Sequence, residues 1–240
     1  MKLLRNIIIG IVLLLVAAAI AFVVLVFDFN PEPEVLELTR PNEATLKAVG
    51  TIDAANAQQF LDALDAPELE TLLVTGGGGS VRHSVEIAQK IHDRGLELVV
   101  DSYCMSSCFN YFVPAASQTT ILPDSILGFH GSAETTAEFL GPLGFMFKGD
   151  IKPERDFLDA IGKPQDMYFR LQEKRQAYVE ENGLDDVNFW MIGPSFFEDF
   201  DVALNPESYF PVSQEELDEQ VKRILDASDE ELTLVMTSDF

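Results

Sequence analysis

Two serines and a histidine lie in segments where they could perform nucleophilic chemistry. Ser106 and Ser107 follow an expected strand in the sequence Asp-Ser-Tyr-Cys-Met-Ser-Ser-Cys-Phe, residues 101–109. His130 ends an apolar run that begins after Leu-Pro-Asp-Ser, residues 122–125. A serine hydroxyl becomes an effective nucleophile when an imidazole removes its proton, so this set could supply a nucleophile and a base. Taken singly, such a serine is more often a helix cap, and such a histidine is more often structural.

Four consecutive glycines, residues 76–79, lie between an expected strand and an expected helix. Glycine allows backbone N–H groups to point inward, which can form a cradle for an oxyanion or a phosphate. The run lacks the lysine and hydroxyl residue that end a P-loop, and it lacks the spacing of a dinucleotide fingerprint. Nucleotide binding is therefore not expected, and a structural turn is the common alternative.

The elements around these segments alternate between strand and helix. The expected strands are 46–50, 70–74 and 96–100, and the expected helices between them are 54–64 and 81–94, the second capped by Gly95. This order is typical of an α/β fold with a mainly parallel sheet. A later helix is expected over 166–181. The apolar segment 141–149 is expected to be a buried loop, with a mobile flap as the alternative.

The combined motifs resemble the Clp-protease/crotonase superfamily, in particular the serine-peptidase branch around the Clp proteolytic subunit. The matching stretches are Gly-Thr-Ile-Asp at 50–53, Gly-Gly-Ser-Val at 78–81 and Leu-Pro-Asp-Ser at 122–125. The Cys-x-Ser-x-Cys turn at 104–108 is similar to that of exported Clp-like bacterial proteins. The resemblance covers roughly residues 46–130, and it implies a spiral of β-β-α units with a mainly parallel sheet.

The same resemblance implies roles for individual residues. Ser106 stands at the position of the nucleophile, in preference to Ser107, and His130 stands at the position of the general base. Backbone N–H groups of Ser107 and of Gly78 or Gly79 would stabilise the oxyanion of a tetrahedral intermediate.

The acidic third member of the family's triad has no matched motif in this chain. Asp185 is the expected candidate from its spacing, with Asp186 or Glu180 as alternatives. Solvated acids at a helix end explain these residues equally well. A Ser–His dyad, an acid elsewhere or an inactive site are the further alternatives.

Cys104 and Cys108 flank Ser106. They could form a disulfide in an oxidising compartment, although a shared helical turn would hold them awkwardly. That objection is weaker if Cys104 ends the strand, and buried packing residues are the alternative. Two cysteines and three scattered histidines do not suggest a metal site, and no metal or cofactor is expected.

Composition excludes several classes of protein. The chain has 240 residues, of which 47% are hydrophobic, so a disordered or fibrous protein is not expected. Its 40 acidic and 16 basic residues give a net charge of −24. Such a charge repels phosphate backbones, so no nucleic-acid partner is expected.

The N-terminal segment predicts a membrane location. Residues 7–27 form an apolar run that would extend roughly 30 Å as a helix, the thickness of a bilayer core. Lys2 and Arg5 precede this run and acidic residues follow it, so the bulk of the chain should lie in the periplasm, outside the bacterial inner membrane. A cleaved signal peptide is the alternative, but its apolar core is usually shorter.

The expected organisation has five parts. They are a cytoplasmic stretch 1–6, a transmembrane anchor 7–27, a linker 28–40, a Clp-like α/β domain 41–212 and an acidic tail 213–240. A short helix is expected within the tail, over 214–225, and the tail as a whole is expected to be solvated.

These observations lead to a membrane-tethered serine hydrolase, most simply a peptidase that acts on peptides or unfolded segments. The alternative is a catalytically inactive scaffold that binds protein partners in the periplasm. An acyl-CoA enzyme of the crotonase type fits poorly, because acyl-CoA is anionic and cytoplasmic. The resemblance also implies self-assembly into homo-oligomers.

Overall fold

The computed structural model describes residues 35–184, 189–225 and 234–235, which belong to one compact unit, Val35–Phe240. No helix among these residues is long and apolar enough to cross a membrane. The expected anchor, residues 7–27, lies outside the described residues.

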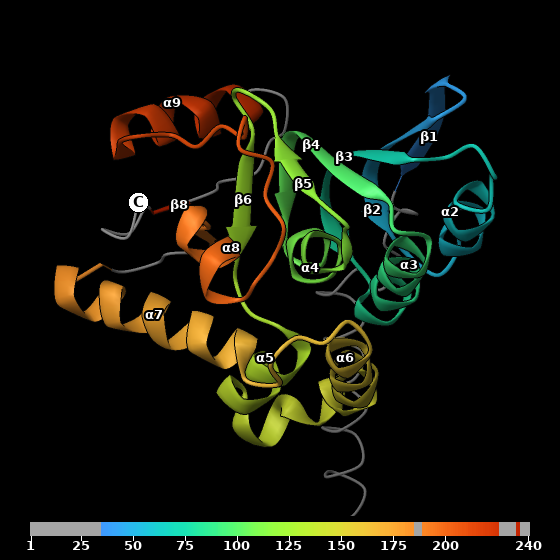
Figure 1. Cartoon of the computed structure of the whole chain (residues 1–240). Helices are drawn as coiled ribbons and strands as arrows, with labels where there is room; N and C mark the ends of the chain where they lie inside the picture. Colours follow the sequence, from blue (N-terminus) through green and yellow to red (C-terminus); the bar gives the residue numbers. More distant parts are fainter. Residues whose placement is uncertain (1–34, 185–188, 226–233, 236–240) are drawn as a thin grey trace, which may run out of the picture. The chain divides into compact units, whose positions relative to one another are not determined.

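An eight-stranded sheet forms the centre of this unit, in the order β1-β2-β3-β4-β6-β7-β8, with β5 also paired with β4 (Figure 1). Pairing is parallel from β2 to β6 and between β7 and β8, whereas β1–β2 and β6–β7 are antiparallel. The expected α/β class is confirmed, and the antiparallel pairs make the sheet mixed. The strands are β1 (Leu36–Asn42), β2 (Thr45–Ile52), β3 (Thr71–Gly79), β4 (Glu97–Met105), β5 (Thr119–Ile121), β6 (Ile126–Phe129), β7 (Phe189–Met191) and β8 (Leu234–Val235).

Helices flank the sheet, and α5, α6 and α7 gather beyond the carboxyl end of β6 (Figure 1). The helices are α2 (Ala57–Ala63), α3 (Val81–Arg94), π-helix η1 (Cys108–Phe112), α4 (Val113–Ala115), α5 (Ala133–Phe139), 3₁₀-helix η2 (Gly141–Phe147), α6 (Lys148–Ala160), α7 (Met167–Asn182), α8 (Pro194–Asp199) and α9 (Gln214–Leu225). The helix expected from residue 54 begins later, because the Asp53 carboxylate accepts hydrogen bonds from the N–H groups of Ala55 and Asn56 and turns the chain there.

The π-helix η1 runs through the middle of the core, and all of its side chains are buried. The rings of Phe109 and Phe129 meet edge to face with centroids 6.2 Å apart, as do those of Phe112 and Phe60 at 6.1 Å. Aromatic pairs of this geometry add to the stabilisation that burial of the rings provides. The packing therefore fixes η1, and with it the serines at its N-terminal end.

Both predicted ends of the domain are corrected. Strand β1 occupies residues 36–42, part of which was expected to be linker, and Leu36 and Leu38 pack against the core. Helix α9 covers the part of the tail where a helix was expected. It is not solvated all round, because Leu217 and Val221 are buried in a cluster with Met105 of β4.

The apolar segment 141–149 is not a buried loop, so that expectation was wrong. It forms η2 and the start of α6, and Leu143, Phe145 and Met146 are each more than half exposed. Phe139, at the end of α5, is also exposed. Gly144 is the buried residue of η2, and a Cβ there would lie 2.0 Å from the carbonyl oxygen of Ala137, so the short glycine lets η2 turn tightly against α5.

The end of β3 approaches η1 so closely that only glycine fits. Gly78 has a φ of +88°, and a Cβ at this position would lie 2.5 Å from the backbone nitrogen of Cys108 and 2.6 Å from that of Ser107. Gly77 has no atom within 4 Å of the corresponding position. Position 78 therefore requires a glycine, whereas the adjacent position 77 has room for a Cβ.

We expect Gly78→Ala to lower the free energy of unfolding by about 2 kcal/mol or more, because its Cβ would push β3 away from η1 and its φ would be strained. Gly77→Ala is the matched control and should change stability by less than about 1 kcal/mol. Urea unfolding of both variants measures the difference. Equal stability of the two variants would contradict the close approach.

Candidate functional site

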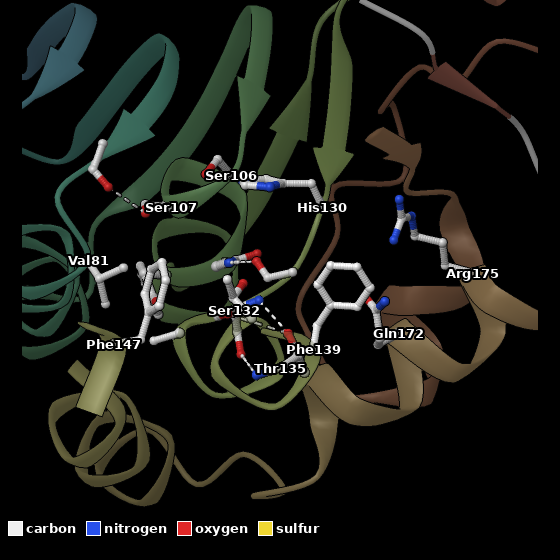
Figure 2. Close-up of a pocket in the computed structure, with 16 residues that line it drawn as sticks. Val81, Ser106, Ser107, His130, Ser132, Thr135, Phe139, Phe147, Gln172 and Arg175 are labelled. Carbon is white, nitrogen blue, oxygen red and sulfur yellow. Dashed lines mark hydrogen bonds between the residues drawn. The ribbon is translucent and has the colours of Figure 1, made fainter. Parts of the chain in front are cut away.

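Ser106 and His130 meet at one side of a surface cavity, where their side chains point toward each other (Figure 2). Oγ of Ser106 lies 2.6 Å from Nε2 of His130. Ser106 follows the last residue of β4, and His130 follows the last residue of β6. Because β4 and β6 pair in parallel at their carboxyl ends, the sheet brings together two residues that are 24 positions apart in sequence.

The backbone of Ser106 is held in an uncommon conformation. Its φ is +54°, in the left-handed region that few non-glycine residues adopt. The Ser106 N–H donates to the carbonyl of Gly128 at 3.0 Å, and the Ser106 carbonyl accepts from the N–H of Asn110 at 2.8 Å. The result is a sharp turn from strand to helix that presents the hydroxyl at its apex, a geometry also used by nucleophiles of α/β hydrolases.

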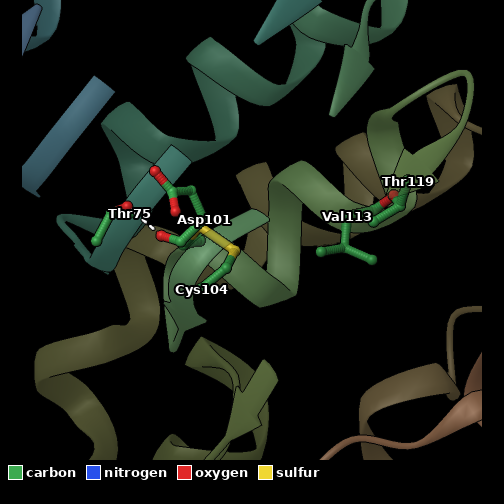
Figure 3. The surroundings of a disulfide bond; sticks show 6 residues. Thr75, Asp101, Cys104, Val113 and Thr119 are labelled. Carbon is green, nitrogen blue, oxygen red and sulfur yellow. Dashed lines mark hydrogen bonds between the residues drawn. A yellow bond between two sulfur atoms is a disulfide. The ribbon is translucent and has the colours of Figure 1, made fainter. Parts of the chain in front are cut away.

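A disulfide between Cys104 and Cys108 closes this turn (Figure 3). Cys104 belongs to β4 and Cys108 begins η1, with their Cα atoms 5.3 Å apart, so the two residues do not share one helical turn. Both are buried. The pairing, which the sequence left open, is therefore present, and Ser106 lies inside a covalently closed loop.

The glycine run lies against the same turn. The Ser107 hydroxyl donates to the carbonyl of Gly79 at 2.9 Å, and Gly79 lines the cavity with both serines. Gly78 packs instead against the backbone of Ser107 and Cys108. Of the two glycines expected near the oxyanion, Gly79 is thus the one that borders the cavity. The Ser107 hydroxyl is already bonded to the Gly79 carbonyl, so Ser107 is less suited than Ser106 to act as nucleophile.

Two neighbours define the surroundings of His130. The ring of Phe189 lies against the imidazole, with centroids 4.8 Å apart. Partial burial lowers the pKa of His130 below its ordinary value, and the positive charge of Arg175 lowers it further. The imidazole therefore stays neutral, and able to accept a proton, at lower pH than an ordinary histidine does.

The acidic third member is not present among the described residues. Within residues 35–184 and 189–225, the hydrogen bond to Ser106 is the one that the His130 ring makes. Glu180 is exposed on α7, where it accepts a hydrogen bond from Gln176 at 3.0 Å and none from His130. Asp185 and Asp186 lie outside the described residues.

A different acid, Glu154 of α6, supports the segment that follows His130, and the sequence interpretation missed it. Glu154 is almost completely buried and accepts hydrogen bonds from the hydroxyls of Tyr111 at 2.6 Å and Ser132 at 2.9 Å. It also accepts from the N–H groups of Ala133 at 3.0 Å and Glu134 at 3.1 Å. Burial raises the pKa of Glu154, and these bonds oppose that effect. A signal was present, because Glu154 shares the helical face of the buried Phe157, Leu158 and Ile161.

The Leu-Pro-Asp-Ser motif has a structural function. Ser125 is buried, and its hydroxyl accepts a hydrogen bond from the N–H of Ser102 at 2.8 Å. Ser102 has a φ of +80°, which marks a local irregularity in β4 shortly before the nucleophile turn. Ser125 therefore stabilises the path of β4 into the site.

The cavity has a volume of about 380 Å³, within the range of ligand pockets. Its lining mixes apolar side chains with polar ones. The lining residues outside the Ser–His pair and its turn are Val81, Asn110, Tyr111, Gly131, Ser132, Ala133, Thr135, Thr136, Phe139, Phe147, Gln172 and Arg175. Among the described residues, no group of acidic, histidine or cysteine side chains could hold a metal ion.

Comparisons with known proteins give only distant similarities. No model of a protein family matches the sequence, and no curated protein matches it significantly. Among solved structures, an enoyl-CoA hydratase from Bacillus halodurans is similar at 12% identity over 82% of this chain and 80% of that chain, with a TM-score of 0.39. A ClpP1 variant from Listeria monocytogenes is similar at 18% identity over 53% and 78%, with a TM-score of 0.36.

An enoyl-CoA hydratase from Bacillus anthracis is similar at 9% identity over 42% of this chain, with a TM-score of 0.33. The match spans about half the length of that hydratase. At these identities and TM-scores, the similarities do not identify an activity.

Removal of the Arg175 charge should raise the pKa of His130, because a nearby cation disfavours the imidazolium ion. We expect the His130 titration to move to higher pH in Arg175→Met, while burial continues to lower the pKa. If a reaction needs neutral His130, the acidic limb of its pH–rate profile should also move to higher pH. NMR titration of the imidazole measures the change. Arg170→Met, on the same helix, is the control, and an unchanged titration in Arg175→Met would contradict the effect.

Replacement of Glu154 should be costly, because four donors around a buried carboxylate would lose their acceptor. We expect Glu154→Ala to lower the free energy of unfolding by about 3 kcal/mol or more. Thermal and urea unfolding measure this change, with the exposed Glu138→Ala on α5 as the control. A loss below about 1 kcal/mol would contradict the network.

The same residue should give stability a pH dependence. The pKa of Glu154 is higher in the folded state than in the unfolded chain, so the folded state binds this proton more tightly. Its contribution to stability is therefore fully present at low pH and decreases as pH rises through the raised pKa. Glu154→Gln should lack this component when unfolding is measured from pH 4 to pH 8.

Proposed function

We propose that this protein is a membrane-tethered, Clp-like serine hydrolase that cleaves peptides or unfolded segments in the periplasm. The observation that carries the proposal is the contact of 2.6 Å between Ser106 Oγ and His130 Nε2 at the edge of a cavity. The Clp-like motifs at 50–53, 78–81 and 122–125 support the same family, and the apolar segment 7–27 supports the tether.

In the proposed reaction, Ser106 Oγ attacks the carbonyl carbon of the substrate while His130 Nε2 accepts the hydroxyl proton. The negative charge that develops on the carbonyl oxygen would be stabilised by backbone N–H groups of Ser107 and Gly79. His130 then gives the proton to the leaving amine, the carbon–nitrogen bond breaks, and an acyl-Ser106 remains. Water attacks the acyl group with His130 as base, which releases the carboxylate and restores Ser106.

The local structure supports a nucleophilic role for Ser106. Its left-handed backbone conformation costs of order 1–3 kcal/mol, and such strain persists where the surrounding structure enforces it, often at functional sites. Here the disulfide and the hydrogen bond to Gly128 enforce it. The lowered pKa of His130 keeps the base in its neutral form near pH 7.

A second candidate function is a catalytically inactive scaffold that binds protein partners. The observation in its favour is that no carboxylate hydrogen-bonds to His130 among the described residues. In serine proteases such a carboxylate orients the imidazole and stabilises its protonated form, and replacing it by an amide can reduce the rate by about 10⁴-fold. Labelling of the serine separates the two candidates.

A fluorophosphonate should label the full-length chain at Ser106, because an activated serine displaces fluoride from phosphorus. We expect Ser106→Ala to abolish labelling and His130→Ala to slow it by at least about 100-fold. The exposed Ser117→Ala is the control and should label as the wild type does. Mass spectrometry of the labelled peptide gives the site.

Labelling that persists in Ser106→Ala would exclude this serine as the nucleophile. A folded wild-type chain that is not labelled at all would favour the scaffold. Circular dichroism of each variant confirms that lost labelling is not lost folding.

A further inference from the structure

The exposed apolar side chains of this protein gather beside the cavity. Among the described residues, large hydrophobic side chains are exposed at six positions, and four of these lie between residues 139 and 146. These four form the η2 patch: Phe139 is 83% exposed, Leu143 58%, Phe145 61% and Met146 60%. Single exposed apolar residues are common on soluble proteins, whereas a group of them marks an interaction surface.

The 3₁₀ geometry of η2 explains why these side chains are exposed. Three residues complete a turn, so residues i and i+3 share a face. Gly144 faces α5, because a Cβ there would lie 2.0 Å from the carbonyl oxygen of Ala137. Leu143 and Met146 share a second face, and Phe145 belongs to the third. All three therefore lie on faces of η2 that α5 does not cover.

The patch continues to the wall of the cavity. Phe139 belongs to the patch and also lines the cavity, as does Phe147 at the end of η2 (Figure 2). The same cavity is bordered by Ser106 and His130, which follow the carboxyl ends of β4 and β6. A surface bound at the patch would therefore lie next to the Ser–His pair.

The described part of the chain begins at this same edge of the sheet. The Val35 carbonyl accepts a hydrogen bond from the N–H of Thr51 at 3.3 Å, and Thr51 pairs with Gly78 at the end of β3. Gly78 in turn lies against the backbone of Ser107. Val35 is apolar and 78% exposed. The chain thus enters the domain on the side where the cavity and the η2 patch lie.

The length of the preceding segment limits the distance between this edge and a bilayer. The apolar run 7–27 is the proposed anchor, and the seven residues 28–34 separate it from Val35. Seven fully extended residues span at most about 25 Å, which is less than the diameter of a small domain. An anchor at 7–27 would therefore hold this edge of the sheet close to the membrane surface.

The local charge suits contact with lipid. The chain has a net charge of −24, yet the sequence contains no acidic residue from 139 to 149, between Glu138 and Asp150. Lys148 follows the patch and is exposed, and such a lysine can keep its ammonium group among lipid headgroups. A second copy of this chain is a less suitable partner, because two chains of this charge repel each other.

We propose that the η2 patch inserts into the interface of the bilayer to which the chain is anchored. Its aromatic and aliphatic side chains would lie among the headgroups and the upper acyl chains, as the apolar faces of interfacial helices do. The inference rests on the tether in the proposed function and adds a second membrane contact. It places the cavity beside the bilayer, which favours substrates held at the membrane surface.

Quenching of tryptophan fluorescence by brominated lipid tests this contact. The full-length chain with Phe145→Trp is reconstituted into phosphatidylcholine vesicles, with or without bromine on the acyl chains. The native Trp190 is 5% exposed, and its emission in the wild-type chain gives the background. We expect brominated lipid to remove about half or more of the emission of the introduced tryptophan, because interfacial apolar faces lie about 5–10 Å into the headgroup and acyl boundary.

Val212→Trp is the matched control. Val212 is also apolar and is 88% exposed, but it precedes α9, whose Arg223 pairs with Asp124 at 3.0 Å, shortly before β6 begins. The η2 patch follows the other end of β6, and Figure 1 shows α9 and α5 far apart. The Val212→Trp variant should therefore keep its emission in brominated vesicles.

Further variants assign the quenching to the patch. Leu143→Asp together with Met146→Asp, added to Phe145→Trp, should restore the emission, because insertion of unpaired charges among acyl chains is unfavourable. The exchange of Leu143→Met with Met146→Leu keeps the patch apolar and should keep the quenching. Circular dichroism confirms that each variant is folded, and flotation of the vesicles measures the tether separately.

Three results would overturn the contact while leaving the tether in place. The first is equal emission in both kinds of vesicle for Phe145→Trp and for a second reporter, Leu143→Trp, in chains that float with the vesicles. The second is quenching that survives the two aspartates, which would place the contact elsewhere. The third is an emission that changes with protein concentration and not with bromine, which would identify a second copy as the occupant.

Two results separate this inference from the rest of the proposed function. A chain that does not float with the vesicles would remove the tether and this inference together. A chain that is quenched in brominated vesicles but not labelled by fluorophosphonate would retain this inference and lose the hydrolase proposal.

Discussion

The contact between the end of β3 and the start of η1 is the constraint on which the site depends. Gly78 lies against the backbone of Ser107 and Cys108 at a distance that leaves no room for a Cβ. This contact sets the position of η1 relative to the sheet, and the buried aromatic side chains of η1 then fill the core around it. Ser106 is held between β4 and η1 as a consequence. A core built in this way leaves the nucleophile turn little freedom to move.

His130 depends on a second support, which is polar. The imidazole itself has one hydrogen bond within residues 35–184 and 189–225, but the segment after it is held by the buried carboxylate of Glu154. Four donors around one carboxylate form a network in which each member is costly to lose. The structure therefore positions the backbone that carries His130, whereas a triad acid would position the ring. The base is thus oriented through its backbone here, whereas a triad orients it through a hydrogen bond to the ring.

Sequence patterns predicted the parts of this molecule that depend on local order. The alternation of strands and helices through Gly95, the helix at 166–181 and the meeting of Ser106 with His130 all followed from periodicity or from linked motifs. The pairing of Cys104 with Cys108 was left open, because it depends on where β4 ends and η1 begins. A shift of about two residues in the end of β4 decides whether the two cysteines can pair, and hydrophobic periodicity does not locate the ends of elements so closely.

The features that were missed depend on long-range contacts. The partner of β1 is β2, and the alternation of Leu36 and Leu38 with polar residues is too short to separate a strand from the linker that follows two prolines. Glu154 meets donors from η1 and α5, which are more than 15 residues away in sequence. The exposure of Phe145 and Met146 contradicts the usual preference of such side chains for the interior, and only the packing of η2 shows it.

The disulfide around Ser106 makes the conformation of the nucleophile turn depend on the redox state of the compartment in which the chain folds. Thiols stay reduced in a bacterial cytoplasm and become oxidised after export. If the chain is exported as proposed, it would leave the cytoplasm with an open nucleophile turn, and the Cys104–Cys108 bond would form afterwards. Because both sulfurs become buried, the oxidation must precede or accompany the closing of the core. The turn would then act as a timing element, since the serine would be held in its final conformation only after the chain has left the compartment where it was made.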